Sequence, residues 1–311
     1  MPKISYICPI FNKIPYLERV LNAIYSQIGD YDKEYIFIND GSTDGSLDFI
    51  KEKTKKWPNT TILSQTNKGP AIATQNGIKR SNGDFLKLVG GDDIMSPDCT
   101  QILLDVIKKT KSVAVFSKYK LFKKFDEIKF NKFKIQDLKT IKNPIEKTLI
   151  SNFSGTTPNL YDNKFVKKSG GCNTKIFIED FSLVLKLSKY GNFSFIKNIL
   201  SYGPADDQNR IMIGKKAQLL HDYNAAIYYF LRENNLQKKI KIVACIKCLG
   251  RAEKWYRRNF KKTIFTNINF LRLKYYLVKT NEEEFVRKSC EIFYKKDVNV
   301  RYKIESFILP N

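Results

Sequence analysis

The sequence predicts an α/β fold, with a doubly wound, mostly parallel sheet flanked by helices and an all-helical C-terminal appendage. Two observations predict the sheet: short apolar runs alternate with helical spacings, and clusters of Asp and Gly follow two of those runs. Near residue 213 a helical period with a basic composition takes over and predicts the appendage. We therefore expect a first domain over residues 1–212 and a basic helical region over residues 213–311.

Four apolar runs early in the chain have the length of short buried strands, and turn-forming residues end them. The runs cover residues 4–8, 34–38, 61–63 and 85–89. We expect the first strand to stop at Pro9. The second should end at Asn39-Asp40-Gly41, and the fourth at Gly90-Gly91-Asp92-Asp93.

Helical spacings of apolar residues separate these runs. They cover residues 15–26, 69–81 and 101–108, and Ser42 or Thr43 is placed to cap a further helix. Strands that alternate with helices predict a parallel sheet, in which ligands bind at the carboxyl ends of strands where the strand order reverses. Both Asp-Gly clusters fall at strand carboxyl ends, which is the first indication of function.

The second half of the chain gives a coarser prediction. Interleaved Phe and Lys over residues 113–145 suggest exposed strands or a hairpin, residues 179–190 a helix and residues 193–200 a strand. Beyond residue 213 a helical face is predicted by Leu220, Tyr223, Ile227 and Phe230. Asn281 followed by Glu284 has the form of a capping box for a late helix.

The composition excludes several classes of protein. A Ser-His-Asp hydrolase or a site with several histidines needs more than the one histidine present, His221, which we interpret as a surface or packing residue. No run approaches the roughly 18 apolar residues of a membrane span, and Met1-Pro2-Lys3 does not resemble a signal peptide. We therefore expect a cytoplasmic protein. Cys245 and Cys248 have ligand spacing but no second pair, so we interpret them as small core residues of a helix.

The formal charge of +24 is concentrated towards the C-terminus. From Lys215 onward there are 22 Lys and Arg against 9 Asp and Glu, a net charge of +13. Such a field attracts polyanions or an anionic membrane surface. A general bias towards Lys, Asn, Ile, Phe and Tyr along the whole chain is the other explanation, and both stay open.

The two acidic turns have the residue types of a nucleotide site. Glycine lets the backbone approach a ligand closely, and a carboxylate such as Asp40 accepts hydrogen bonds from a ribose hydroxyl or a pyrimidine N–H. Asp92 and Asp93 are adjacent carboxylates, and Mg²⁺ binds one or two carboxylates together with substrate phosphate oxygens. Ordinary turn and helix-cap chemistry also favours these residue types. The presence of two such turns in one domain favours the interpretation that they bind a ligand.

The order and spacing of these motifs resemble a family 2 glycosyltransferase of GT-A fold. The resemblance covers roughly residues 1–210 and rests on the segments Cys8-Pro9-Ile10-Phe11-Asn12, Asn39-Asp40-Gly41-Ser42-Thr43-Asp44-Gly45-Ser46, Asn67-Lys68-Gly69, Asn76-Gly77, Gly83-Asp84-Phe85 and Asp92-Asp93. It implies an inverting enzyme of the hexosyltransferase class that uses nucleotide-diphosphate sugars and a divalent metal, Mg²⁺ or Mn²⁺.

The resemblance also implies roles for single residues. Pro9, Asp40 and Asp84 would line the base and ribose site, and Asp92 with Asp93 would bind the metal. The wider donor site would include Phe11, Asn12, Ser42, Lys68 and Gly91. Glu179-Asp180-Phe181-Ser182-Leu183 resembles the family's later acidic pair, so Asp180 is predicted as the base, with Glu179 as the second choice. Acidic residues also favour the first turn of a helix for electrostatic reasons.

Two departures from the family pattern bear on the donor site. Gly90 stands where the family usually carries an Asp, which removes one carboxylate and bears on metal use or donor preference. The loop over Tyr202-Gly203-Pro204-Ala205-Asp206-Asp207 lacks the Arg and His that many members place there, so Arg210 is our hypothesis for neutralising the diphosphate.

The predicted function is transfer of a sugar, with a UDP-sugar as the first candidate, to a surface-glycan or lipid-linked saccharide acceptor. The basic, aromatic segments Trp255-Tyr256-Arg257-Arg258 and Lys274-Tyr275-Tyr276 would hold the enzyme peripherally at an anionic inner membrane face, or would form a solvated helical face. One alternative is a nucleic-acid-binding protein that uses the same basic surface, although no recognition motif is present. Another is a non-catalytic member that binds only the nucleotide, which the Gly90 departure suggests.

Overall fold

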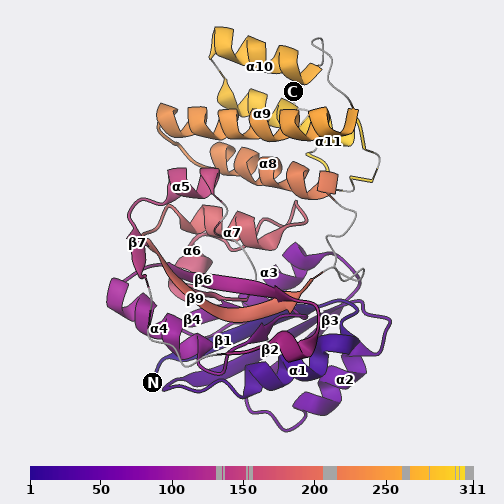
Figure 1. The fold of residues 1–311 in the computed structure, drawn as a ribbon, viewed down its shortest axis with the longest axis vertical. Helices are drawn as coiled ribbons and strands as arrows, with labels where there is room; N and C mark the ends of the chain where they lie inside the picture. The colour runs from indigo at the N-terminus through magenta and orange to yellow at the C-terminus, as the bar shows by residue number, and fades with distance from the viewer. Residues whose placement is uncertain are drawn as a thin grey trace.

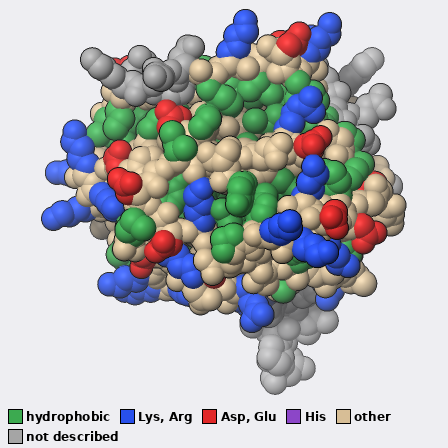
Figure 2. Space-filling model, turned by 90° about the horizontal axis from the view of Figure 1, so that it is seen from below, with side chains coloured by type: hydrophobic (Ala, Val, Ile, Leu, Met, Phe, Trp, Pro, Cys, Tyr) green, Lys and Arg blue, Asp and Glu red, His purple; other side chains and the backbone are tan. Residues whose placement is uncertain are grey.

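The protein is described by a computed structural model. It covers residues 1–304 apart from 131–134, 136, 152, 154–156, 206–215, 261–266, 280, 298 and 301. Figure 1 shows a sheet with helices on both faces at one end of the molecule and a stack of helices at the other. On the surface of the sheet end seen from below, Lys and Arg side chains are interspersed with Asp and Glu (Figure 2).

Within the described residues, nine strands form one mixed sheet in the order β3-β2-β1-β4-β8-β6-β9-β5, and β7 pairs with β9. The strands are β1 (Lys3–Ile10), β2 (Asp32–Asp40), β3 (Thr60–Gln65), β4 (Phe85–Leu88), β5 (Ile94–Met95), β6 (Ala114–Phe122), β7 (Lys139–Ile141), β8 (Asn159–Asp162) and β9 (Phe193–Pro204). Strands β1 to β4 are parallel, and β8 runs antiparallel to both β4 and β6. The predicted fold class, a mostly parallel doubly wound sheet, is confirmed.

Helices cover both faces of this sheet and form the far end of the molecule. They are α1 (Ile14–Tyr25), α2 (Ser46–Thr54), α3 (Pro70–Arg80), α4 (Cys99–Thr110), α5 (Ile145–Ile150), α6 (Asn163–Lys168), α7 (Glu179–Leu187), α8 (Lys216–Arg232), α9 (Lys238–Phe260), α10 (Asn267–Val278) and α11 (Glu282–Tyr294), with a short 3₁₀ helix at Phe125–Glu127. Apolar residues of α1, α2 and α4 form the core on one face of the sheet, and those of α3, α6 and α7 form it on the other.

The first strand does not stop at Pro9, as predicted, but continues to Ile10 with Pro9 opposite Ile38. Ile7 accepts a hydrogen bond from the backbone of Val89, so Ile7, and with it Pro9 two residues later, faces the β4 side. Strand β4 has already ended at Leu88. Proline is tolerated there because no ladder hydrogen bond is lost.

Two other predicted details differ. Helix α2 begins at Ser46, and its N–H donates to Oδ1 of Asp44 at 3.0 Å, so Asp44 satisfies the first turn in place of Ser42 or Thr43. Residues 114–122 form β6 between β8 and β9, and Ala114 to Ser117 are buried in the sheet. Of the two predicted alternatives, exposed strands or a hairpin, the first is therefore partly right: Lys118 to Leu121 are exposed, but the strand they belong to lies inside the sheet.

The C-terminal helices share one hydrophobic core with α5 and α7, and α8 lies directly on α7. Cys245 and Cys248 are buried in α9, and His221 is a buried packing residue whose Nδ1 lies 2.7 Å from Asp222. Because this core is continuous with α7, the division at residue 212 stays a prediction. None of the described helices combines the length and the apolar composition needed to cross a membrane.

Candidate donor site at the carboxyl edge of the sheet

The strand order reverses at β1, which places two loops beside each other. From β1 the chain forms β2 and β3 on one side and then β4 on the other. In open α/β sheets the crevice at such a reversal is where ligands bind. The segment after β1, the turn after β2 and the Gly90–Asp93 turn after β4 therefore meet at one edge of the sheet.

Side-chain and backbone hydrogen bonds join the first two of these loops. The backbone N–H of Asn12 donates to Ser42 Oγ at 3.1 Å, and Thr43 N–H donates to Asn12 Oδ1 at 2.8 Å. Asn12 has a left-handed backbone with φ 52°, and Lys13 N–H donates to Ser46 Oγ at 3.0 Å. Asn12 and Ser42, both predicted as donor contacts, thus shape the edge by binding each other's loops. Phe11 beside them is half-buried.

Asp40 is buried and organises the turn that precedes α3. Its Oδ1 accepts from Gln65 Nε2 and from Lys68 N–H, each at 2.8 Å, and its Oδ2 accepts from Gly69 N–H at 2.9 Å. Gly41 is required next to it, because a Cβ at that position would lie 2.8 Å from the backbone nitrogen of Asn67. The side chain of Lys68 is exposed on this turn. Asp40 lies at the carboxyl edge of the sheet, and the protein's own donors already bind both of its oxygens.

The turn after β4 carries a buried ion pair. Lys13 Nζ donates to Asp92 Oδ2 at 2.6 Å, and the two side chains are 5% and 14% exposed. Gly91 packs closely on the end of β1, since a Cβ there would lie 3.2 Å from Lys13 Cγ and 3.3 Å from the Pro9 carbonyl oxygen. This contact brings the predicted donor residues Pro9 and Gly91 together with Asp92. The sequence prediction did not include Lys13, although it directly follows the Cys8–Asn12 motif.

Asp93 occupies a different environment from Asp92. The residue is fully buried, and its Oδ2 accepts from Thr157 Oγ1 at 2.7 Å, while Thr157 Oγ1 accepts from Gly90 N–H at 2.9 Å. A Cβ at Gly90 would lie 2.7 Å from Asp93 Oδ2, so glycine makes room for this carboxylate. The structure therefore corrects the prediction of Asp93 as a second metal ligand: its carboxylate holds the turn in place.

Lys87 of β4 binds the segment around Thr157 that contacts the same turn. Its ammonium is fully buried and donates to the carbonyl oxygens of Thr157 at 2.5 Å and Asn159 at 2.9 Å. Burial lowers the pKa of Lys87. Neither Lys87 nor Thr157 was predicted, because a lysine inside an apolar strand and a threonine in an unassigned loop carry no local signal of their partners.

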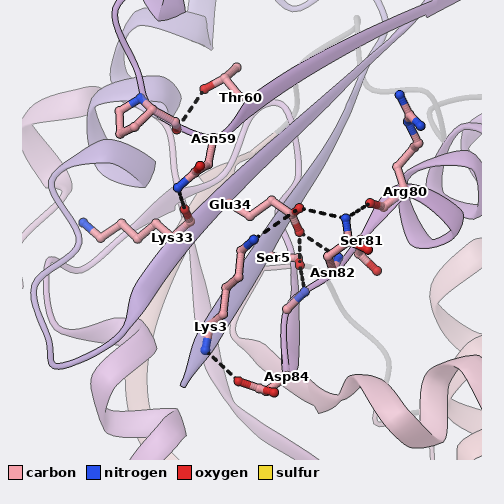
Figure 3. Close-up of polar contacts among 12 residues, drawn as sticks. Lys3, Ser5, Lys33, Glu34, Asn59, Thr60, Arg80, Ser81, Asn82 and Asp84 are labelled. Atoms are coloured by element: carbon pink, nitrogen blue, oxygen red, sulfur yellow. Dashed lines mark hydrogen bonds and ion pairs between the residues drawn. The ribbon is translucent and has the colours of Figure 1, made fainter. Parts of the chain in front are cut away.

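Asp84 lies at the opposite edge of the sheet, which corrects its assignment to the base and ribose site. It immediately precedes β4, and its Oδ2 accepts from the backbone N–H of Lys3 at 2.9 Å, near Ser5, Glu34 and Asn82 (Figure 3). Strand β4 separates it from Asp92 by its whole length. Asp84 instead lines a pocket of about 390 Å³ at that edge, together with Gly83, Phe85, Asp162, Asn163, Lys164 and Lys167.

The acidic pair Glu179 and Asp180 begins α7 beside the turn that Asp40 organises. A Cβ at Gly69 would lie 3.5 Å from the ring of Phe177, two residues before the pair. Burial, and then the neighbouring charge of Asp180, raise the pKa of Glu179 to about 8. Asp180 accepts a hydrogen bond from the N–H of Phe181 at 2.6 Å. Two adjacent carboxylates that hold one proton near neutral pH are suited to acid–base chemistry.

Among the described residues, no cluster of three His, Cys, Asp or Glu side chains could hold a metal ion. A single carboxylate with phosphate oxygens is enough for Mg²⁺, and Asp92 fits this requirement only if the ion displaces the Lys13 ammonium. Arg210, the predicted partner of the diphosphate, lies in 206–215, outside the described residues.

Known proteins match both the sequence and the fold. A family model described as glycosyl transferase family 2 matches residues 5–172. Chondroitin synthase from Pasteurella multocida (strain Pm70) is 25% identical over 309 residues, and hyaluronan synthase from Pasteurella multocida is 24% identical over 309 residues. Each match covers 98% of this chain and 29% of the relative, so the chain spans less than a third of their length.

Solved structures also have a similar fold. Residues 1–349 of S. aureus TarS superpose with a TM-score of 0.62 at 15% identity, over 95% of this chain and 92% of that one. The same protein in complex with UDP-GlcNAc gives a TM-score of 0.59 at 18% identity, over 94% and 81% of the two chains. Mannosyltransferase PcManGT from Pyrobaculum calidifontis, in complex with GDP-Man and Mn²⁺, gives a TM-score of 0.59 at 14% identity, over 95% and 88%.

Proposed function

This chain belongs to glycosyl transferase family 2 and has the GT-A fold, and we propose that it transfers a sugar from a nucleotide-diphosphate donor to a saccharide hydroxyl. A UDP-sugar is the first candidate donor. The acceptor is a surface glycan or a lipid-linked saccharide. The observation that carries the proposal is the convergence of the Asp40 turn and the Lys13–Asp92 ion pair at the end of β1.

Charge at this edge suits a diphosphate. Asp92 would hold Mg²⁺ or Mn²⁺, which supplies positive charge to the diphosphate leaving group. The Lys13 ammonium, displaced from this carboxylate by the ion, would supply a second positive charge from within the chain. PcManGT was solved with GDP-Man and Mn²⁺, and TarS with UDP-GlcNAc, which supports a donor of this class.

Asp180 is the proposed base. It would accept the proton of the acceptor hydroxyl as that oxygen attacks the anomeric carbon from the face opposite the leaving nucleotide, which inverts the configuration. The raised pKa of Glu179 supports Asp180 as the base. Near neutral pH the carboxyl group of Glu179 already holds a proton and cannot accept another. Glu179 would then stay protonated next to the base and would not accept the proton of the acceptor hydroxyl.

Calorimetric titration of the full chain tests the donor site. We expect UDP to bind, and Mn²⁺ or Mg²⁺ to tighten that binding relative to the same titration in EDTA. Salt-sensitive oligonucleotide binding without any UDP signal would instead support the nucleic-acid function. UDP binding without turnover across a panel of UDP- and GDP-sugars would support a non-catalytic member of the family.

Lys13→Met separates the two sources of positive charge. If Lys13 only blocks the metal, the variant binds Mn²⁺ more tightly and UDP at least as well. If Lys13 also contacts the diphosphate, the variant binds UDP about tenfold more weakly, the cost of one charged hydrogen bond. Electron paramagnetic resonance of Mn²⁺ in the absence of nucleotide measures the first effect independently of activity.

A further inference from the structure

Helix α10 is apolar on two opposite sides. Ile268, Leu271 and Tyr275 follow the spacing i, i+3, i+7 and are buried against the other helices. The residues two positions away from each of these repeat the spacing on the outside: Phe270 is 68% exposed, Leu273 57% and Leu277 77%. An apolar face of a helix is normally covered by another apolar surface. The part of the chain that the structure describes leaves this outer face open.

Further exposed side chains flank these three residues. Tyr276 and Val278 extend the outer face at 47% and 48% exposure, and the exposed Lys274 lies next to Leu273. Figure 1 shows α10 as the outermost helix, at the end of the molecule away from the sheet. The opposite end, seen from below in Figure 2, mixes charges of both signs among its hydrophobic side chains.

The charge of the surrounding segment indicates what covers the face. Residues 238–279 contain 13 Lys and Arg and a single acidic residue, Glu253, for a net charge of +12, half of the charge of the whole chain. Glu253 is paired with Arg257 and Arg272, and Lys238, Lys239 and Lys241 pair with acidic residues outside the segment, which leaves an excess of positive charge. An anionic partner is therefore favoured, and it must also accept aliphatic side chains.

We propose that the outer face of α10 docks this protein on an anionic lipid bilayer, with Phe270, Leu273 and Leu277 at the level of the acyl chains. Cations such as Lys274 would lie among the headgroups. Nucleic acid matches the charge but offers no environment for leucine side chains. A second copy would need about 800 Å² on each partner for a stable interface, more than these few partly exposed side chains provide. The proposal is independent of the transfer reaction.

The proposal changes which residues are expected to touch the membrane. The sequence pointed to the segments Trp255-Tyr256-Arg257-Arg258 and Lys274-Tyr275-Tyr276. Of their aromatic residues, Trp255 and Tyr275 are buried in the helical core, whereas Tyr276 is exposed on the outer face. The aromatic rings of Trp255 and Tyr275 pack against Phe293 and Phe285 of α11, at centroid distances of 5.0 Å and 5.2 Å. The exposed apolar side chains Phe270, Leu273 and Leu277 of α10 take the role that the sequence assigned to Trp255 and Tyr275.

Co-sedimentation of the full chain with vesicles tests the proposal. We expect binding to phosphatidylcholine vesicles that contain phosphatidylglycerol, little binding to pure phosphatidylcholine, and weaker binding at high salt. Replacing both leucines, Leu273→Glu and Leu277→Glu, should lower the bilayer partition by about tenfold or more. The matched control replaces Ile28 and Leu121, which are 60% and 45% exposed in the sheet domain, with Glu. It should sediment as the unmodified protein does.

Three outcomes would overturn the proposal. They are equal sedimentation of the Leu273→Glu/Leu277→Glu variant, equal binding to neutral vesicles, and a dimer lost in that variant without any vesicle binding. A circular dichroism melting curve shows whether the variant has folded. If the donor site is as proposed, UDP binding by the variant shows the same. A polarity-sensitive probe on Leu277→Cys gives a second readout, because the six native cysteines are all buried. Its emission should shift to the blue with anionic vesicles, and no shift contradicts docking through α10.

Discussion

The carboxyl edge of the sheet and the helical stack beyond α7 are stabilised by different interactions. At the edge, short loops are held by polar groups that bind one another, as Asp40 binds Lys68 and Gly69 and Asp93 binds Thr157. In the helical stack, apolar packing holds the elements together, and α10 leaves apolar side chains exposed on its outer face. Substitutions at the edge should therefore alter binding and turnover, whereas those in the stack should alter stability or membrane contact.

One contact joins the two regions. Tyr302, near the end of the described chain, donates its hydroxyl hydrogen to the Lys68 carbonyl oxygen at 2.9 Å. Its backbone N–H donates to Gln218 of α8 at 3.1 Å. The helical region therefore reaches back to the turn that Asp40 organises. Substitutions in the helical stack leave donor binding unchanged only if this contact contributes little to it.

The largest effect is expected for Asp180→Asn. It removes the proposed base without changing the size of the side chain, so kcat should fall by about 10²–10⁴-fold. UDP affinity should stay close to that of the unmodified protein. Steady-state kinetics with the best donor from a nucleotide-sugar screen measures the first quantity, and calorimetry the second. Near-normal turnover would remove Asp180 from the mechanism.

A comparison of Asp92→Asn with Asp84→Asn tests at which edge of the sheet the donor binds. Asp92→Asn should weaken metal-dependent UDP binding by about tenfold or more, since it removes the proposed metal ligand. Asp84→Asn serves as the matched control, because Asp84 lies at the opposite edge of the sheet. UDP titrations with and without Mn²⁺ measure both. If the two variants lose affinity equally, the site is not where we place it.

The raised pKa of Glu179 predicts a dependence of stability on pH. Because its pKa of about 8 lies above the ordinary 4.5, the folded protein keeps a proton that the unfolded chain has already lost. The free energy of unfolding should therefore fall as the pH rises from 4.5 towards 8. We expect a fall on the order of 2 kcal/mol, discounted for partial exposure.

Glu179→Gln isolates this effect, because glutamine does not titrate. Urea unfolding of both proteins across that pH range should show a flatter dependence for the variant. Parallel curves for the two proteins would mean that Glu179 does not carry the proton.

The smallest effect is expected in the helical stack. Asn281 is the N-cap of α11, and its side chain accepts from the N–H of Glu284, while Glu284 pairs with Arg287 instead of completing the capping box. Asn281→Ala should lower the free energy of unfolding by about 1 kcal/mol. Chemical denaturation measures that loss, and UDP affinity should not change. A fall in affinity would show that the helices support the donor site.

The sequence predicted the elements of the first ninety residues well, because each is encoded by a local pattern. Strand and helix periods and the Asp-Gly turns need no long-range information. The interior position of β6 was not recognised, since Lys118 to Leu121 in its second half are exposed. The roles of Asp84 and Asp93 were misjudged for a different reason. A motif states which residues are present, but not which end of a strand, or which side of a turn, each one occupies.

The sequence by itself determined the α/β class, the two acidic turns, the helical C-terminus and the concentration of positive charge. Local spacing and composition are sufficient for these features. Only the tertiary structure decided that Lys13 pairs with Asp92, that Thr157 binds Asp93, and that α10 exposes its second apolar side. Those facts depend on contacts between residues dozens of positions apart, or on which helix face is covered. No local period specifies either.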